Sequence, residues 1–242
     1  MKLYGKNPVL ERIKTNPKSI KHILIEQGHS ESAYIHMKGK QWGISVSTVP
    51  YTKIQKLARN LNTQGIIAEV EEFPYMNIDD LLSTAIEKKW SIVFLDNLTD
   101  PQNLGGIIRT CGSLGGFAIV LPTTESVAVT ETVLRVACGG DNFVTVARVS
   151  NLGNAIEKAK KLGFWIMGTS TKEAKSIFDV ILQFPLGVVL GSEDKGIREI
   201  IRKKLDQEVT IPMKHERMSL NVAHASSILC YEIIRSRRSI KD

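Results

Sequence analysis

Residues 91–121 have the sequence SIVFLDNLTDPQNLGGIIRTCGSLGGFAIVL. Two short apolar runs, 91–95 and 117–121, enclose a polar loop and a segment with apolar residues at helical spacing. That stripe consists of Leu104, Ile107, Ile108, Cys111 and Leu114. Apolar positions that recur at i, i+3, i+4 and i+7 are typical of an amphipathic helix, and short apolar runs are typical of buried strands. The stretch therefore predicts a strand–loop–helix–strand unit with parallel strands.

The same alternation continues to the end of the chain. Further strands are expected at 143–149, 164–168, 186–191 and 208–213, and further helices at 130–139, 154–163, 196–205 and 221–238. Nearly continuous apolar strands that alternate with helices predict a mostly parallel sheet covered on both faces. The fold class is α/β.

The first third of the chain predicts a smaller α/β unit. We expect helices at 8–14 and 51–61 and strands at 21–27, 43–49 and 65–73. Pro74 interrupts the pattern, and Asn77 is a suitable N-cap for a helix at 78–89. We place the domain boundary here, which divides the chain into residues 1–76 and 77–242.

The net charge of +7 is unevenly distributed. Residues 1–78 hold 11 Lys and Arg against 6 Asp and Glu, whereas the rest holds 21 against 19. A basic first third favours binding of a polyanion such as RNA. No apolar run is long enough to span a bilayer, so we predict a soluble, cytoplasmic protein with no membrane partner. The three cysteines lack zinc or disulfide spacing and are expected to be buried free thiols.

Three polar loops follow predicted strands, at 96–106, 191–196 and 213–221, and the first two contain glycine. Ligands of parallel α/β sheets bind beyond the carboxyl ends of the strands, so these loops are the candidate site. No dinucleotide fingerprint, P-loop, H-E-x-x-H or G-x-S-x-G motif occurs. These absences disfavour a dehydrogenase, a P-loop NTPase, a metalloprotease and a serine hydrolase, and we predict no metal site.

Arg109 lies off the apolar stripe, and three of its four helical neighbours are Gly105, Gly106 and Gly112. Each glycine inside a helix costs about 1 kcal/mol relative to alanine. We interpret these glycines as leaving a bare surface on which an RNA backbone approaches the guanidinium.

Three segments resemble, in order and spacing, the motifs of the SpoU (TrmH-like) branch of the SPOUT RNA methyltransferases. They are DPQNLGGIIRTCGSLG (100–115), VLGSEDKGI (189–197) and IPMKHERMSLNVAHASSILCYE (211–232). YGKNPVLERI and TQGIIAEV in the first third resemble the L30e-like substrate-binding domain of the rRNA enzymes of that family. The resemblance implies a C-terminal SPOUT (α/β-knot) domain with a trefoil knot, S-adenosyl-L-methionine as cofactor, and a homodimer through the catalytic domain with the active site near the subunit interface.

The resemblance also implies roles for individual residues. The implied catalytic residues are Arg109, Asn103, Glu193, Ser219 and Asn221. The implied cofactor-binding residues are Gly191, Ile211, Leu220, Ser219, Thr169 and Met213. Simpler interpretations remain open: Asn103 and Ser219 as helix caps, and Glu193 as an exposed turn residue. Lys214, His215 and Arg217 form a charged loop where relatives often have small residues, and are candidates for RNA contact.

The implied reaction is methyl transfer from S-adenosylmethionine to a ribose 2'-hydroxyl of RNA, with a guanosine of 23S rRNA as the expected target. The resemblance implies that Arg109 is the general base. Because a guanidinium is protonated at neutral pH, a clamp on the phosphate beside the target ribose is an equally good interpretation, and the sequence leaves both open. The alternatives are a tRNA 2'-O-methyltransferase, a non-catalytic RNA-binding or ribosome-assembly factor, and, more remotely, a small-molecule methyltransferase.

Overall fold

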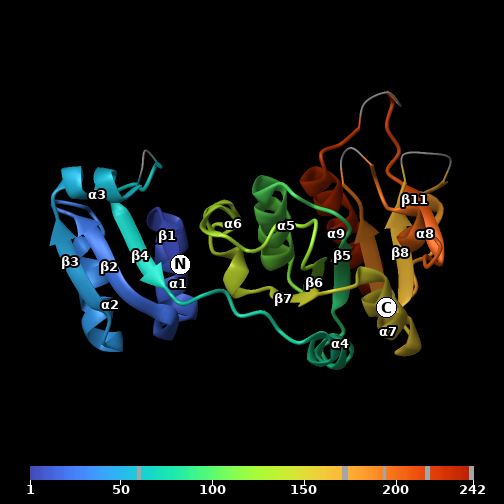
Figure 1. The fold of residues 1–242 in the computed structure, drawn as a ribbon, viewed down its shortest axis with the longest axis horizontal. Helices are drawn as coiled ribbons and strands as arrows, with labels where there is room; N and C mark the ends of the chain where they lie inside the picture. Colours follow the sequence, from blue (N-terminus) through green and yellow to red (C-terminus); the bar gives the residue numbers. More distant parts are fainter. Residues whose placement is uncertain (59–60, 171–173, 193–194, 216–218, 240–242) are drawn as a thin grey trace.

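The computed structural model describes residues 1–58, 61–170, 174–192, 195–215 and 219–239. Its strands form two separate sheets, a four-stranded sheet near the N-terminus and a seven-stranded sheet after it. Figure 1 shows the smaller sheet on the left, joined to the rest by an extended segment that runs from β4 to α4. No described helix is both long and apolar enough to cross a membrane.

The N-terminal unit is a mixed sheet with order β1-β4-β2-β3, in which β2 and β3 are parallel and β4 is antiparallel to both its neighbours. Its elements are β1 (Lys2–Tyr4), α1 (Lys6–Thr15), η1 (Pro17–Ser19), β2 (Ile20–Glu26), α2 (Ser32–Trp42), β3 (Ser45–Val49), α3 (Tyr51–Ala58) and β4 (Ile66–Val70). Sequence reasoning missed α2, because only Ile35 and Gly39 of that helix are buried and no apolar stripe marks it.

The larger sheet is parallel throughout, with order β7-β6-β5-β10-β8-β11-β9. Its strands are β5 (Ser91–Leu95), β6 (Phe117–Pro122), β7 (Thr145–Val149), β8 (Trp165–Thr169), β9 (Lys175–Ser176), β10 (Leu186–Leu190) and β11 (Gln207–Thr210). The helical segments between and after them are α4 (Ile78–Glu87), α5 (Pro101–Leu114), α6 (Glu131–Ala137), η2 (Gly140–Asn142), α7 (Leu152–Lys161), η3 (Ile177–Asp179), α8 (Glu199–Arg202) and α9 (Val222–Ser239). The predicted mostly parallel α/β sheet is confirmed.

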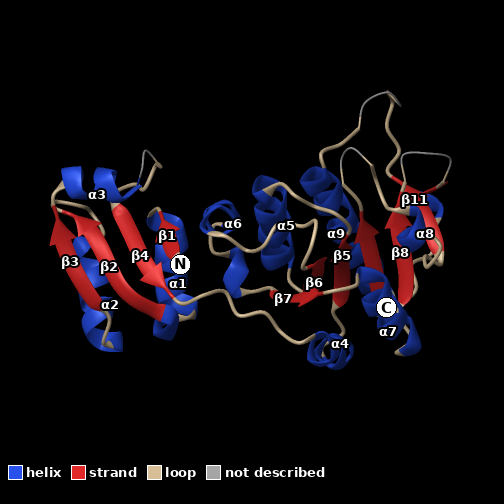
Figure 2. Ribbon diagram, viewed as in Figure 1, coloured by secondary structure: helices blue, strands red, loops and turns tan. Residues whose placement is uncertain are grey.

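Helices cover both faces of this sheet, because successive side chains of a strand point to opposite sides. On β5, Val93 and Leu95 belong to the core that includes α5, α6 and α9, whereas Ile92 and Phe94 belong to the core of α4, α7 and α8. Figure 2 shows these helices flanking the strands of the larger sheet. The strands β5, β6 and β10 are almost entirely apolar because both of their faces are buried.

Several local predictions are confirmed and others are refined. Asn77 caps α4, since its side chain accepts a hydrogen bond from the Asp79 backbone N–H at 2.8 Å. Cys111 and Cys230 are buried free thiols, but Cys138 is only partly buried, at the left-handed C-cap of α6. The trefoil knot and the domain boundary at 76–77 stay predictions.

The interpretation of the glycines around Arg109 as a bare RNA-facing surface is wrong. A Cβ at Gly105 would lie 2.5 Å from Cβ of Val136 on α6, and one at Gly106 would lie 3.0 Å from Cβ of Ala223 on α9. At Gly112 a Cβ would lie 2.6 Å from the carbonyl oxygen of Gly140. The glycines allow other elements to pack closely against α5, which explains why the helix tolerates their poor propensity.

We therefore expect Gly112→Ala to lower the free energy of unfolding by about 1–3 kcal/mol, the usual cost of overpacking. The added methyl group meets backbone atoms of η2, which cannot rotate away. Urea denaturation measures the loss. An unchanged or raised unfolding free energy, as helix propensity alone predicts, would contradict the packing explanation.

Candidate functional site: a pocket at the strand ends

The carboxyl ends of β8, β10 and β11 open into one pocket of about 490 Å³. It is lined by all six residues predicted to bind the cofactor, namely Thr169, Gly191, Ile211, Met213, Ser219 and Leu220. Parallel strands end at the same edge of the sheet, so three loops that are distant in sequence converge there. Described residues of two of the three candidate loops, 191–196 and 213–221, line this pocket, whereas the loop at 96–106 contributes no residue to its lining.

The pocket has apolar walls and polar groups at its rim. Leu190, Ile197 and Val222 are buried and contribute to the apolar walls. The charged residues of the lining are Lys195, Arg198, Glu199 and Arg202. This mixture, apolar walls with a few placed polar groups, is characteristic of pockets that bind small organic ligands and cofactors.

Gly191 allows the loop after β10 to fold back tightly. A Cβ at this position would lie 2.1 Å from the carbonyl carbon of Gly196 and 2.3 Å from the backbone nitrogen of Ile197. The turn is closed by the Gly196 backbone N–H, which donates to the Ser192 carbonyl at 2.9 Å. Only glycine fits, because the neighbouring atoms are backbone atoms on the wall of the pocket.

The first and third loops are joined by a hydrogen bond between two predicted site residues. Asn221 Nδ2 donates to Asn103 Oδ1 at 2.8 Å, and Asn103 is only 5% exposed. Neither simpler interpretation as a cap holds: Asp100 caps α5, and the Asn221 side chain, rather than Ser219, accepts from the Ala223 N–H at the start of α9. Asn103 therefore connects the first turn of α5 to the edge of the pocket.

Asp96, which sequence reasoning missed, attaches the pocket loop to β5. Its carboxylate is fully buried and accepts hydrogen bonds from the Arg198 backbone N–H and from Arg198 Nε, each at 2.8 Å. Arg198 also approaches Glu125, with 3.8 Å between Nη1 and the carboxylate. The sequence contained a signal, since Asp96 follows the apolar run 91–95 directly, at the end of a buried strand.

We expect Asp96→Asn to lower the free energy of unfolding by about 2 kcal/mol, a usual value for hydrogen bonds to a charged group. It should also weaken ligand binding in the pocket, because Arg198 and Ile197 lose their attachment to β5. Urea denaturation and calorimetric titration measure the two effects. Lys158→Met, which removes one half of an exposed pair with Asp79, serves as control; an equal response of both variants would contradict the role of Asp96.

Arg109 lies outside this pocket. It is exposed and lines a separate shallow groove of about 320 Å³ with Thr110, Ser113, Leu114, Ser227 and Tyr231. Helix α9 holds α5 in place at this point, since Thr110 Oγ1 and Ser227 Oγ are 2.8 Å apart. Within one chain, the structure does not bring Arg109 to the pocket that contains the predicted cofactor residues.

Cys111, two residues beyond Arg109, has no catalytic signature. Its contact with Cys230 and its burial raise the pKa of the Cys111 thiol well above the ordinary value. A neutral, buried thiol is not a nucleophile. Cys111 packs α5 against α9, as the interpretation of a structural cysteine predicts.

Some predicted residues are not placed. Glu193 and Arg217 lie outside the described residues. Lys214 and His215 are exposed, and Ser219 is exposed at the pocket. Among the described ranges, no three His, Cys, Asp or Glu side chains come together in a way that could hold a metal ion.

Comparison with known proteins assigns both parts of the chain. Residues 91–231 match the SpoU rRNA Methylase family, and residues 2–76 match the family described as RNA 2'-O ribose methyltransferase substrate binding. A Bacillus subtilis protein assigned to the TrmH family of tRNA/rRNA methyltransferases, YacO, is 34% identical over 98% of this chain and 96% of its own. A Staphylococcus epidermidis protein with the same assignment is 36% identical over 99% of this chain and 97% of its own.

Solved structures share the fold. The SpoU methyltransferase AviRb from Streptomyces viridochromogenes, in complex with AdoMet, superposes with a TM-score of 0.80 at 22% identity over 99% of this chain and 91% of its own. An AdoMet-bound rRNA methyltransferase from Sinorhizobium meliloti superposes with a TM-score of 0.81 at 22% identity, over 98% of this chain and 87% of its own. The A. aeolicus TrmH/SpoU tRNA modifying enzyme gives 0.56 at 27% identity and covers 68% of this chain and 86% of its own. By its two family matches and its full-length relatives, the chain belongs to the SpoU (TrmH-like) family of RNA methyltransferases.

Proposed function

We propose that this protein transfers a methyl group from S-adenosylmethionine to a ribose 2'-hydroxyl of RNA, with a guanosine of 23S rRNA as target. The observation that carries the proposal is the single pocket at the ends of β8, β10 and β11, which gathers all six predicted donor-binding residues. The RNA 2'-O ribose methyltransferase substrate-binding match over residues 2–76 supports the 2'-hydroxyl as acceptor.

The residues of the pocket fit the donor. A volume of about 490 Å³ lies within the range of cofactor sites. Ile211 and Leu220 provide apolar walls for an adenine ring, and Thr169 and Ser219 provide hydroxyl groups. The tight turn at Gly191 brings backbone groups to the wall without a side chain between them and the ligand.

Bound S-adenosylmethionine supplies a methyl group that is already activated by the positive charge of its sulfonium. When bound, it would supply this methyl group to the ribose oxygen and leave as a neutral thioether, and the hydroxyl proton would pass to solvent. The protein therefore needs no acid for the leaving group; its residues must align the ribose and assist loss of the hydroxyl proton. Alignment alone supplies about 7–11 kcal/mol in favourable cases.

Asn103 and Asn221 orient the reacting end of the pocket through their hydrogen bond, and Asn103 is held in place by burial in the first turn of α5. Arg109 is an exposed cation six residues further along the same helix. We assign it to the phosphate beside the target ribose, because a protonated guanidinium binds phosphate with two parallel hydrogen bonds and favours alkoxide charge.

The target assignment rests on the N-terminal unit. The A. aeolicus tRNA modifying enzyme matches 68% of this chain, whereas the S. meliloti rRNA methyltransferase matches 98%. A chain that carries the additional N-terminal unit thus resembles the rRNA enzyme over its whole length. The basic excess of residues 1–78 suits this unit to gripping RNA.

We propose that two copies pair through the surface of α5 and α9. Arg109 lies away from the pocket of its own chain, in a groove bordered by Tyr231, which is 64% exposed, and close to Ile228, which is 40% exposed. A second copy packed on this face covers both apolar side chains and encloses Arg109 at the interface. Sedimentation equilibrium of the wild type and of Tyr231→Lys tests the pairing.

The decisive experiment uses unmodified transcripts of 23S rRNA and tRNA, with S-adenosylmethionine labelled in its methyl group. We expect label in the 23S transcript at one nucleotide, mapped as an alkali-resistant linkage because a 2'-O-methyl group blocks cleavage of the next phosphodiester. Label on a base, or only in tRNA, would overturn the acceptor or the target. RNA binding without any binding of S-adenosylmethionine would favour the assembly factor.

A further inference from the structure

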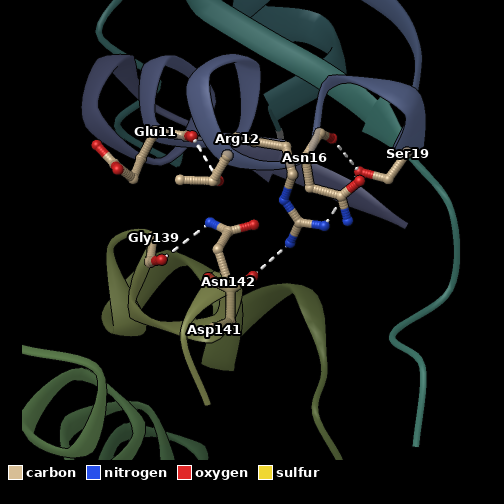
Figure 3. Close-up of polar contacts among 8 residues, drawn as sticks. Glu11, Arg12, Asn16, Ser19, Gly139, Asp141 and Asn142 are labelled. Carbon is tan, nitrogen blue, oxygen red and sulfur yellow. Dashed lines mark hydrogen bonds and ion pairs between the residues drawn. The ribbon is translucent and has the colours of Figure 1, made fainter. Parts of the chain in front are cut away.

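The N-terminal unit is attached to the catalytic part through a buried ion pair. Arg12 on α1 contacts the Asp141 carboxylate on η2 through Nη2, and only 7% and 1% of the two side chains are exposed. Arg12 Nη1 also donates to Ser19 Oγ at 3.2 Å. Figure 3 shows the guanidinium extending from α1 toward η2, with Asn142 and Gly139 beside it.

Further contacts extend this interface. We call it the seam: the surface at which α1 and β1 of the N-terminal unit meet α6 and η2 of the catalytic part. Glu131 on α6 accepts from the Lys2 backbone N–H at 2.8 Å and from the Tyr4 hydroxyl at 3.1 Å. At Gly139, whose φ is +93°, a Cβ would lie 2.8 Å from the Glu11 side chain. Apolar side chains from both sides of the seam, including those of Val9 and Leu134, belong to one continuous core.

The connecting segment is also held against the catalytic part. The Tyr75 hydroxyl accepts from the Val129 N–H at 2.8 Å, and the Met76 N–H donates to the Val146 carbonyl at 2.9 Å. The N-terminal unit is therefore attached to the catalytic part at two places, the seam and the connecting segment.

The seam touches the helix that carries Arg109. A Cβ at Gly140 in η2 would lie 2.9 Å from the Cα of Arg109 and 3.1 Å from the carbonyl oxygen of Ile108. No side chain separates the backbone of η2 from that of α5. Since η2 also contacts α1 through the ion pair, it lies between α1 and α5. Contacts therefore connect Arg12, through Asp141 and the neighbouring Gly140, to the backbone at Arg109.

Stability alone is a poor explanation for this ion pair. Burial raises the pKa of the Asp141 carboxyl above its ordinary value, and the attraction of Arg12 offsets this only in part. Arg12 Nε and Asn142 Oδ1 are buried and have no hydrogen-bond partner among the described residues. Buried ion pairs can often be replaced by apolar side chains without loss of stability, and in some proteins what they contribute is a specific geometry.

We propose that Arg12 and Asp141 are positioning residues that set the place of the RNA-binding unit relative to Arg109. RNA bound by the N-terminal unit then presents one ribose to the pocket, so the seam takes part in choosing the nucleotide that is methylated. This inference rests on the proposed function.

The test compares three full-length proteins: wild type, Arg12→Met/Asp141→Leu, and the control Lys158→Met/Asp79→Leu. The control removes the same two charges from an exposed pair inside the catalytic part. The probe is an unmodified 23S rRNA transcript. For the seam variant we expect unchanged S-adenosylmethionine affinity and a kcat lower by about 10- to 100-fold, because misplacement by about 1 Å has this effect. Methylation should also spread to neighbouring nucleotides, whereas the control keeps the wild-type kcat and target.

Two measurements without RNA separate this proposal from the proposed function. Small-angle scattering should show a larger radius of gyration for the seam variant, and hydrogen exchange should be faster at α5 amides near Arg109. Arg12→Lys, which keeps the cation, should recover most of the kcat. Wild-type kcat and target choice in the seam variant, or unchanged scattering and exchange, would overturn the positioning role. A wild type that methylates no RNA would contradict the proposed function, while scattering and exchange would still test the seam.

Discussion

Arg109→Ala is expected to lower kcat for methyl transfer by about 10²–10³-fold, the usual effect of removing one preorganised charge at a reacting centre. Donor binding should be unchanged, because Arg109 lines a groove separate from the pocket at the strand ends. Single-turnover methylation of the 23S transcript measures the first quantity, and calorimetric titration with S-adenosylmethionine measures the second. Arg109→Ala that turns over at the wild-type rate would refute any catalytic role.

Arg109→Lys distinguishes the two possible roles of this residue. As a phosphate clamp, lysine keeps the charge but loses the paired hydrogen bonds, so kcat should recover in part without a change in the shape of the pH–rate profile. As a general base, lysine titrates at lower pH than a guanidinium, so the profile should move to lower pH. The exposed position of Arg109 on α5 makes the clamp the expected outcome.

The sequence was sufficient to predict the central buried strands of the larger sheet and its parallel α/β class, because that signal is local. Both faces of β5, β6 and β10 are buried, so each strand is a short apolar run between helices. The strand order is a tertiary property: β10 lies between β5 and β8, and no feature of residues 186–190 indicates those neighbours. Helix α2 was missed because only two of its residues are buried, so its sequence has no apolar stripe that would predict a helix.

The candidate site was predictable where family motifs mark it, and not where partners are distant. The six residues that the motifs mark as cofactor-binding line one pocket, and their role there stays a prediction. Arg12, in contrast, resembles any basic residue of a helix, and its partner Asp141 is 129 positions away. The glycines near Arg109 were misinterpreted because the sequence cannot distinguish a glycine that makes room for a ligand from one that makes room for another backbone segment. The packing of Gly140 against Gly112 is visible only in the structure.

Gly191→Ala is expected to weaken S-adenosylmethionine binding by about 10- to 100-fold, which corresponds to the 1–3 kcal/mol of a typical overpacking effect. The new methyl group would lie 2.1 Å from the Gly196 carbonyl carbon and 2.3 Å from the Ile197 nitrogen. Backbone atoms cannot rotate away as a side chain can, so the loop must move. Because Ile197 lines the pocket and Arg198 is fixed to Asp96, this movement distorts the donor site.

Gly187→Ala is the matched control, because it places the same methyl group on β10, four residues before the loop position Gly191. There a Cβ would meet side-chain atoms only, at 2.8 Å from Ile166 Cδ1 and 2.9 Å from the Phe94 ring, in the core away from the pocket. We expect this variant to lose stability in thermal denaturation while keeping the wild-type donor affinity. If both variants lost affinity in proportion to their stability, the effect at Gly191 would be general destabilisation, and the close approach of the two backbone segments would have no specific role in holding the donor.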